Sequence, residues 1–229
     1  RERERFVKEA KTVALLQHPH IVQIFTIIEE GEQTYIVYEH IDGRTLHEEL
    51  NENPGRRLEP RRALEFLRQI AGAVDHAHER KIIHRDLKPS NVMMTRVGDK
   101  YWLKVMDFGI ARQVQDALAH TSTNTIVGTP MYMAPEQSAG IVTKQSDVYA
   151  LGIILYEMLT GGLPFRNKDN PMERSSEGSV YPASSLLPSL PPAIDAVIAK
   201  ALAPNYENRY QSCMEFYAAV EDALTQVTP

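Results

Sequence analysis

The pattern of apolar and polar positions predicts a short mixed α/β start. Apolar residues recur at helical spacing from Glu4 to Gln17, and His18-Pro19 should end that helix, because the residue before proline is pushed out of the α region. Two β-branched runs follow, from Ile21 to Glu29 and from Thr34 to Glu39. The short polar turn between these runs predicts a hairpin.

Beyond Gly43 the pattern is mostly helical. A long helix should begin at Pro60, where the first turn tolerates proline, and present one apolar face down to about Arg80. The apolar stretch from Val148 to Leu159 predicts a buried helix that is too short to cross a bilayer. Residues 167–192 are rich in Pro and Ser and should have little regular structure. The other predicted elements are helices at 46–50, 194–202 and 214–224 and strands at 92–94 and 101–106.

Composition narrows the class of protein. With 43% hydrophobic and 24% charged residues, the chain has the make-up of a soluble globular protein and not of a disordered or fibrous one. A net charge of -5 without a basic face argues against nucleic-acid binding. Cys213 is the single cysteine and has no Cys or His at metal-ligand spacing in the sequence, so we expect a plain buried thiol in a reducing compartment.

Candidate chemistry is concentrated in the stretch His84-Arg-Asp-Leu-Lys-Pro-Ser-Asn. Asp86 is a candidate proton acceptor, Lys88 supplies a cation, and Asn91 carries an amide oxygen that can bind a metal. The predicted strand pair should bring Asp107 back toward this loop. Together these groups indicate a site that binds a metal-bound phosphate beside a hydroxyl nucleophile. Taken alone, Asp86 could also be a loop carboxylate that caps nearby amides.

The order of these motifs resembles that of the eukaryotic-type protein kinases over nearly the whole chain. It continues through Ala134-Pro135-Glu136, Asp147 and Arg209. The Lys-Pro-Ser-Asn continuation and Gly128-Thr129-Pro130 are similar to the Ser/Thr branch of the family. The segment Val-Gly-Thr-Pro-Met-Tyr-Met-Ala-Pro-Glu-Gln is most similar to bacterial Ser/Thr kinases.

The resemblance implies an α+β, protein-kinase-like fold with a mainly α-helical large lobe and a truncated β/α small lobe. The implied boundaries are a small-lobe remnant over residues 1–38, a hinge over residues 39–43 and a large lobe over residues 44–229.

By the same resemblance, Asp86 accepts or orients the proton of the substrate hydroxyl, and Lys88 neutralises charge on the transferred phosphoryl group. Asn91 and Asp107 would bind two Mg²⁺ ions, which prefer oxygen ligands. Thr129 would bridge Asp86 and Lys88. The implied cofactors are ATP and Mg²⁺.

The resemblance places the adenine pocket at the end of the predicted hairpin. Tyr38 matches the gatekeeper and should restrict the back of the pocket, Glu39 and Ile41 would offer backbone groups to adenine, and Met93 would lie beneath the ring. Tyr and Met at these spacings could equally be plain core, and for Met93 both interpretations can hold.

Several residues are expected to support the site without touching substrate. His84 would pack against the ring of Phe108, with Val13 and Ile24 completing an apolar stack. Gly109 would allow the Asp107 loop to move.

The resemblance also implies polar supports in the large lobe. Asp147 would hold the backbone of the His-Arg-Asp turn. Glu136 would form a buried ion pair with Arg209, although Arg209 could instead be a surface cation.

Arg85, directly before Asp86, suggests control by phosphorylation, because a phosphate can pair with that arginine. Thr121 and Thr123 match the bacterial phosphosites by their distance from Gly128-Thr129. The same Thr/Ser-rich stretch could also be only a flexible polar loop.

The start of the chain departs from the family pattern. No Gly-x-Gly-x-x-Gly loop and no Val-Ala-Ile-Lys strand precede the first helix, so Glu9, which matches the helix glutamate of the family's Lys-Glu pair, is expected to lack a partner. Two explanations stay open: an active kinase whose first three strands are missing from this sequence, or a pseudokinase scaffold that acts by protein binding. A small-molecule kinase is less consistent with Ala134-Pro135-Glu136 and the Thr129 loop.

The sequence therefore predicts a serine/threonine protein kinase domain that transfers the γ-phosphoryl group of ATP to protein hydroxyls, with impaired activity in this chain. The expected partners are protein substrates and a second kinase for trans-phosphorylation, with no nucleic acid and no membrane contact from this segment. The expected location is the cytoplasm, either free or as part of a membrane-anchored parent.

Overall fold

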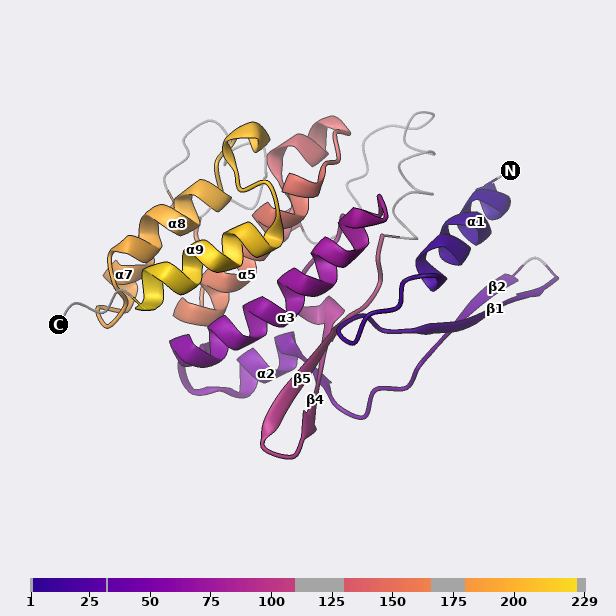
Figure 1. Cartoon of the computed structure of the whole chain (residues 1–229), viewed down its shortest axis with the longest axis horizontal. Coiled ribbons are helices and arrows are strands. Elements are labelled where there is room, and N and C mark those ends of the chain that lie inside the picture. The colour runs from indigo at the N-terminus through magenta and orange to yellow at the C-terminus, as the bar shows by residue number, and fades with distance from the viewer. Residues whose placement is uncertain (1, 32, 110–129, 166–179, 226–229) are drawn as a thin grey trace.

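The computed structural model describes residues 2–31, 33–109, 130–165 and 180–225 (Figure 1). The strands in these ranges form two antiparallel sheets, β1-β2 and β3-β4-β5. The helices and strands are α1 (Glu2–Ala14), β1 (Ile24–Glu30), β2 (Gln33–Tyr38), β3 (Arg44–Thr45), α2 (Leu46–Glu52), α3 (Pro60–Glu79), β4 (Val92–Val97), β5 (Lys100–Val105), α5 (Lys144–Thr160), α7 (Ala183–Leu186), α8 (Ala193–Ala201) and α9 (Cys213–Thr225).

The helical body is organised around α5, which is buried on every side. From Ser146 to Leu159 each of its residues is buried, so this helix forms the centre of the core and has no solvent-facing stripe. The amphipathic helix α3 packs against α5, α9 and β5. A Cβ at Gly152 would lie 3.1 Å from the side chain of Ala201, so glycine here allows α8 to approach closely.

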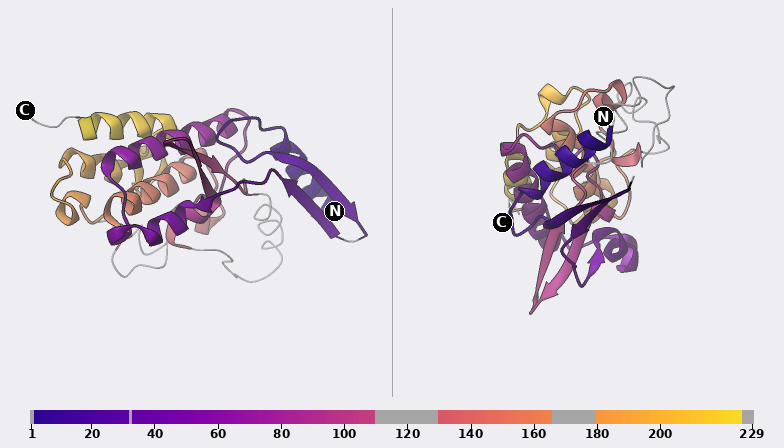
Figure 2. Two further views of the ribbon diagram at one scale, coloured as in Figure 1. Left: turned by 90° about the horizontal axis from the view of Figure 1, so that it is seen from below. Right: turned by 90° about the vertical axis from the view of Figure 1, so that its right-hand side faces the viewer.

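The unit made of α1, β1 and β2 extends away from the helical body (Figure 2). It is joined to the body by the segment before β1, where Val22 donates its amide to the carbonyl of Val105 at the end of β5. The unit leaves large apolar side chains in water: Leu15 is 76% exposed and Phe25 is 67% exposed. The unit therefore presents apolar surface to solvent.

The first helix is shorter than predicted. It ends at Ala14 and not at Gln17, because the amides of Leu15 and Leu16 close three-residue turns in place of helical hydrogen bonds. Leu16 turns into the core while Leu15 remains in water. A helical apolar pattern thus continues past the point where the backbone leaves the helix.

The first strand also begins later than predicted, at Ile24 and not at Ile21. Ile21 forms a parallel bridge with Val105 of β5 and is not paired with β2. The start of the β-branched run therefore pairs with β5, and the residues from Ile24 onward pair with β2.

The structure has three short features that the sequence pattern does not predict. Strand β3 pairs with Met93 and Met94 of β4, and a Cβ at Gly43 would collide with the carbonyl oxygen of Met94. Strand β4 continues to Val97, and a single helical turn, α7, lies in the stretch expected to lack regular structure. Elements this short have too few residues to show a period.

Three histidines meet where the segment before β1 contacts the end of α3. The rings of His18 and His76 are 4.9 Å apart, and the ring of His20 lies 4.5 Å from that of Trp102. Burial lowers the pKa of all three histidines, and the neighbouring charges of His76 and Arg80 lower the pKa of His18 further. The junction therefore favours neutral imidazoles.

Hydrogen exchange should show that the α1-β1-β2 unit is less stable than the helical body. Amides of β1 should exchange faster than those of α5, because β1 has an exposed face and α5 is fully buried. The measurement is native-state exchange followed by mass spectrometry. Equal protection of β1 and α5 would contradict this expectation.

The histidine cluster predicts a loss of stability in mild acid. Because the folded pKa values lie below 6.5, the unfolded state binds more protons at these three positions as pH falls through that value, and the contribution of the cluster to the free energy of unfolding decreases. In urea denaturation the double variant His18→Gln/His76→Gln should depend less on pH between about pH 7.5 and 5.5 than the wild type. The matched control is His40→Gln, which changes an exposed histidine outside the cluster and should keep the wild-type slope.

Candidate active site

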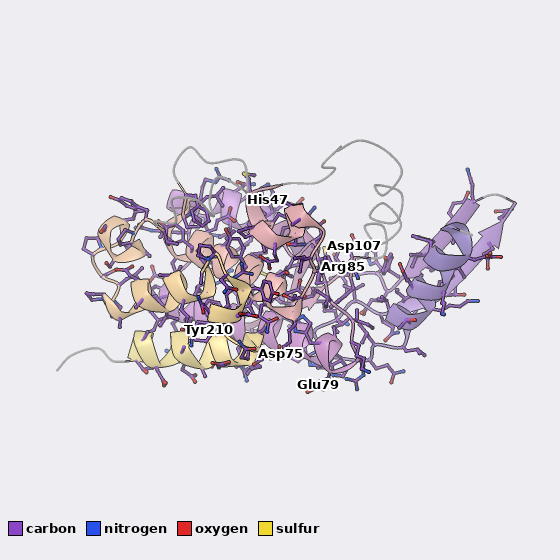
Figure 3. All side chains as sticks on the ribbon, turned by 90° about the horizontal axis from the view of Figure 1, so that it is seen from above. His47, Asp75, Glu79, Arg85, Asp107 and Tyr210 are labelled. Carbon is purple, nitrogen blue, oxygen red and sulfur yellow. The ribbon has the colours of Figure 1, made fainter. Side chains whose placement is uncertain are left out.

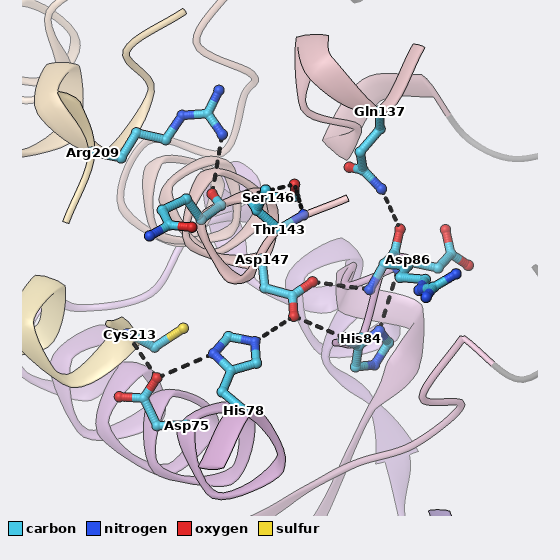
Figure 4. Close-up of polar contacts among 12 residues, drawn as sticks. Asp75, His78, His84, Asp86, Gln137, Thr143, Ser146, Asp147, Arg209 and Cys213 are labelled. Carbon is cyan, nitrogen blue, oxygen red and sulfur yellow. Dashed lines mark hydrogen bonds and ion pairs between the residues drawn. The ribbon is translucent and has the colours of Figure 1, made fainter. Parts of the chain in front are cut away.

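Asp147, in the first turn of α5, holds the backbone of the loop that starts at His84. Its Oδ2 accepts the amide of His84 at 2.8 Å and its Oδ1 accepts the amide of Arg85 at 2.9 Å (Figure 4). Arg85 adopts a left-handed conformation with φ of 67°, which costs energy for a residue with a Cβ. The buried carboxylate of Asp147 offsets that cost, and the contact predicted from the sequence is present.

His84 joins this loop to the end of β5. It is fully buried, and burial lowers its pKa, so the ring is neutral. Its Nε2 donates to the carbonyl of Met106 at 2.9 Å, and its Nδ1 accepts the amide of Asp86 at 3.3 Å. Its ring centroid lies 4.7 Å from that of Phe108. The expected packing of His84 on Phe108 is therefore present, and these contacts are structural.

Met106 fixes the position of Asp107. Its amide donates to the carbonyl of Asn91 at 2.9 Å, while its own carbonyl accepts from His84. Gly109 packs so closely on the loop that a Cβ there would lie 2.8 Å from the carbonyl of His84. Figure 3 shows Asp107 beside Arg85, on the side of the helical body that faces α1. The two acidic loops, separated in sequence, are thus brought together.

Asp86, Lys88 and Asn91 form a compact polar group. The Nζ of Lys88 lies 2.7 Å from Oδ2 of Asp86, and both side chains are partly exposed. The Nδ2 of Asn91 donates to the backbone carbonyl of Asp86 at 2.8 Å. A carboxylate held beside an ammonium can orient a hydroxyl while the cation faces the group that the hydroxyl attacks.

The oxygen atoms of Asn91 and Asp107 are suited to a hard divalent cation. Because the amide nitrogen of Asn91 is bound to Asp86, the side chain presents its oxygen to a metal. Asp107 adds carboxylate oxygens from the neighbouring loop. This donor set fits Mg²⁺, which prefers oxygen ligands.

Tyr38 makes a contact that sequence reasoning missed. Its hydroxyl donates to Oδ1 of Asp107 at 3.2 Å, and burial together with the charge of Asp107 raises the pKa of Tyr38. The tyrosine therefore remains protonated. The contact connects the end of β2 to the candidate metal site.

The structure limits which backbone group Glu39 can offer to adenine. The amide of Glu39 donates to the carbonyl of Gln23 at 2.9 Å, so Glu39 can offer a base its carbonyl but not its amide. The carboxylate of Glu39 is also engaged, at 2.5 Å from Nζ of Lys104. Ile41 lies in the irregular segment after β2, and Met93 lies on β4 with its side chain half-buried. Their roles as nucleotide contacts stay predictions.

Sequence reasoning also missed His78, which contacts Asp147. His78 of α3 has its Nε2 2.7 Å from Oδ2 of Asp147 and its Nδ1 3.5 Å from Oδ1 of Asp75. Burial opposes protonation, but the neighbouring carboxylates of Asp147 and Asp75 raise the pKa of His78 to about 9. The signal was hard to find, because a histidine on an amphipathic helix has no distinguishing pattern.

The predicted ion pair between Glu136 and Arg209 is present and buried. Two parallel contacts of 2.7 and 2.8 Å join the guanidinium to the carboxylate. Arg209 is only 2% exposed and also donates to the carbonyls of Ala203 and Gln145. Ser146 donates to Glu136, so the pair is well satisfied. The alternative of a surface cation at Arg209 is wrong.

The remaining predicted residues have different outcomes. Thr121, Thr123 and Thr129 lie outside the described residues. Glu9 is partly buried in α1 and takes part in interactions, so the expectation that it lacks a partner is wrong. The predicted apolar stack has Val13, Ile24 and Phe108 in one buried core, although the direct contact of Val13 with Phe108 stays a prediction.

Comparisons with known proteins identify a matching family. Residues 1–219 match the family described as protein kinase domain. The serine/threonine-protein kinase PrkC of Bacillus subtilis (strain 168) is 37% identical over 223 residues, which is 96% of this chain and 34% of PrkC. The serine/threonine-protein kinase PknB of Mycobacterium tuberculosis (strain ATCC 25618 / H37Rv) is 41% identical over 224 residues, with 93% and 35% covered. The chain spans about a third of the length of these relatives.

Solved structures share the fold. The crystal structure of the Mycobacterium tuberculosis PknI kinase domain matches with a TM-score of 0.77 and 30% identity, covering 96% of this chain and 79% of that chain. Rad53 residues 1-466 in complex with AMP-PNP matches with a TM-score of 0.77 and 26% identity, covering 93% and 53%.

Removal of Arg209 should destabilise the helical body strongly. Arg209→Met leaves the carboxylate of Glu136 buried without its cation, which should lower the free energy of unfolding by about 3–5 kcal/mol in urea denaturation. The matched control is Arg96→Met, which removes an exposed cation 3.6 Å from Asp99 and should change stability little. Equal effects of the two substitutions would contradict a structural role for the buried pair.

Proposed function

The chain belongs to the protein kinase family, as a domain of the bacterial serine/threonine type, and on that premise we propose that its site transfers the γ-phosphoryl group of Mg·ATP to serine or threonine hydroxyls of proteins. The observation that carries the proposal is the arrangement of Asp86, Lys88 and Asn91 in a loop held by Asp147, with Met106 placing Asp107 alongside.

Each side chain has a distinct role in the proposed reaction. Asp86 orients the acceptor hydroxyl and takes its proton, and Lys88 stabilises negative charge on the transferred group. Asn91 and Asp107 hold the metal through oxygen atoms. When bound, Mg·ATP supplies the phosphoryl group and the positive charge that neutralises its oxygens. The catalytic loop thus contributes positioning and electrostatics.

The nucleotide base would bind beside the segment after β2. In the proposal residues 39–43 form a hinge between a small unit, residues 1–38, and the large lobe, residues 44–229. The carbonyl of Glu39 and the backbone of Ile41 face the adenine, Met93 contacts the base from β4, and Tyr38 closes the back of the pocket. The hydrogen bond from Tyr38 to Asp107 supports this arrangement, because it brings the end of β2 to the metal site.

Regulation and partners follow from the same proposal. Arg85, held in its strained conformation next to Asp86, would pair with a phosphate on Thr121 or Thr123, and a second kinase molecule would add that phosphate. Thr129 would bridge Asp86 and Lys88. The proposed compartment is the cytoplasm, where protein substrates and ATP are available. No helix in the described ranges has the length and apolarity that a membrane span requires.

A scaffold that acts by protein binding is the second candidate. The exposed side chains on the α1-β1-β2 unit favour it, because Leu15, Phe25, Ile28 and Tyr35 all present apolar surface to solvent. In this case the site would bind nucleotide without measurable transfer. The two candidates therefore differ in turnover and not in nucleotide affinity.

Two variants test the proposed catalytic roles separately. Asp86→Asn should leave nucleotide affinity unchanged and lower phosphoryl transfer to a Ser/Thr peptide by about 10²–10⁴-fold, because it removes the proton acceptor. Asp107→Ala should abolish the dependence of ATP binding on Mg²⁺, measured by calorimetry. The matched control is Asp99→Asn, a fully exposed acid on the turn after β4.

A rate of phosphoryl transfer in Asp86→Asn equal to that of the wild type would contradict the role of Asp86. Mg²⁺-dependent binding of ATP by wild type without any transfer would favour the scaffold candidate.

A further inference from the structure

A cluster of three different ligand types lies in the helical body, outside the catalytic loop. Asp75 and His78 stand one turn apart on α3, and Cys213 is the first residue of α9 (Figure 4). The ligand atoms of these three side chains lie within 4.8 Å of one another. Sequence spacing could not reveal this group, because Cys213 is 138 positions from Asp75.

His78 is oriented as a metal-binding histidine would be. Its side chain is 6% exposed, and its Nε2 is bound to the carboxylate of Asp147 at 2.7 Å. Its Nδ1 is buried without a hydrogen-bond partner in the described part of the chain and lies 3.5 Å from Oδ1 of Asp75. Metal-binding histidines commonly donate their second ring N–H to a carboxylate, which fixes the tautomer and aims the other nitrogen at the metal.

Asp75 is held in place by α9 and keeps lone pairs for a further ligand. Its Oδ1 accepts the amide of Cys213 at 2.9 Å, and its Oδ2 accepts the amide of Met214 at 2.8 Å. Each carboxylate oxygen can accept more than one bond. The side chain of Asp75 is 18% exposed, so this ligand meets solvent while the thiol of Cys213 is buried.

A proton and a metal would compete for the same position. In the metal-free protein, a proton on Nδ1 makes His78 an imidazolium between two carboxylates. Burial and the charge of Asp75 raise the pKa of the Cys213 thiol, so a metal must displace that proton too. Metal affinity should therefore rise with pH.

We propose that Asp75, His78 and Cys213 form a binding site for Zn²⁺. One carboxylate oxygen, one imidazole nitrogen and one thiolate sulfur are all ligands that Zn²⁺ accepts, and a water molecule would complete a tetrahedron. The thiolate and imidazole disfavour Mg²⁺ and Ca²⁺, which prefer oxygen. This site is distinct from the one at Asn91 and Asp107.

The proposed site is connected to the catalytic loop through Asp147. The same Oδ2 that contacts Nε2 of His78 accepts the amide of His84, at 2.8 Å. A metal on Nδ1 would hold the ring of His78 in the tautomer that donates to Asp147. Zn²⁺ would therefore stabilise the backbone that carries Asp86 without touching it.

Cobalt absorption provides a direct test, because Co²⁺ substitutes for Zn²⁺ in such sites and the chain has a single cysteine. Titration of the whole chain with Co²⁺ should produce a thiolate-to-cobalt charge-transfer band that saturates at one equivalent. Zn²⁺ should abolish the band and raise the melting temperature, and Mg²⁺ should do neither. Absence of the band, or no shift in melting temperature with Zn²⁺, would overturn the proposal.

Two variants separate this site from surface histidines. Cys213→Ala should abolish the band and weaken Zn²⁺ binding at least tenfold, and Asp75→Asn should weaken it while retaining an oxygen for the cap of α9. The control is His76→Gln, which removes a histidine next to His18 and should leave Zn²⁺ affinity unchanged. Zn²⁺ affinity that persists in both Cys213→Ala and Asp75→Asn, or is lost in His76→Gln, would refute the assignment.

Discussion

The buried carboxylate of Asp147 is the constraint on which the site depends. It accepts the amides of two successive loop residues, His84 and Arg85, and it stands at the start of the most deeply buried helix. A left-handed arginine is tolerated only where its surroundings oppose relaxation of the backbone. The rigidity of α5 is therefore transmitted to the loop by two hydrogen bonds, which is why the loop can hold Asp86 in one place.

Around this constraint the structure uses backbone groups to bring the two acidic loops together. Met106 is bound on one side to the carbonyl of Asn91 and on the other to the ring of His84. A neutral, fully buried imidazole suits this role, because it can donate at one nitrogen and accept at the other. Backbone groups and His84 thus hold the two loops, and the proposed chemistry is assigned to the side chains of Asp86, Lys88 and Asp107.

The order of the motifs and the helical period account for most of the features that could be predicted from the sequence. The long helices and the Glu136–Arg209 pair could be predicted because each has a local signature or a fixed place in the family's motif order. The candidate catalytic residues have such a place as well. The errors have a common cause. The end of α1, the divided strand at Ile21 and the short strand β3 depend on which distant backbone offers a hydrogen bond.

By itself the sequence determined the family, the helical body and the candidate catalytic residues, since these follow from periodicity and from motifs within a few positions. Only the tertiary structure decided that Tyr38 contacts Asp107 and that the single cysteine stands beside Asp75 and His78. Such contacts join residues 69 and 138 positions apart. Packing of the helices sets these distances, and no local pattern of residues records which side chains will meet.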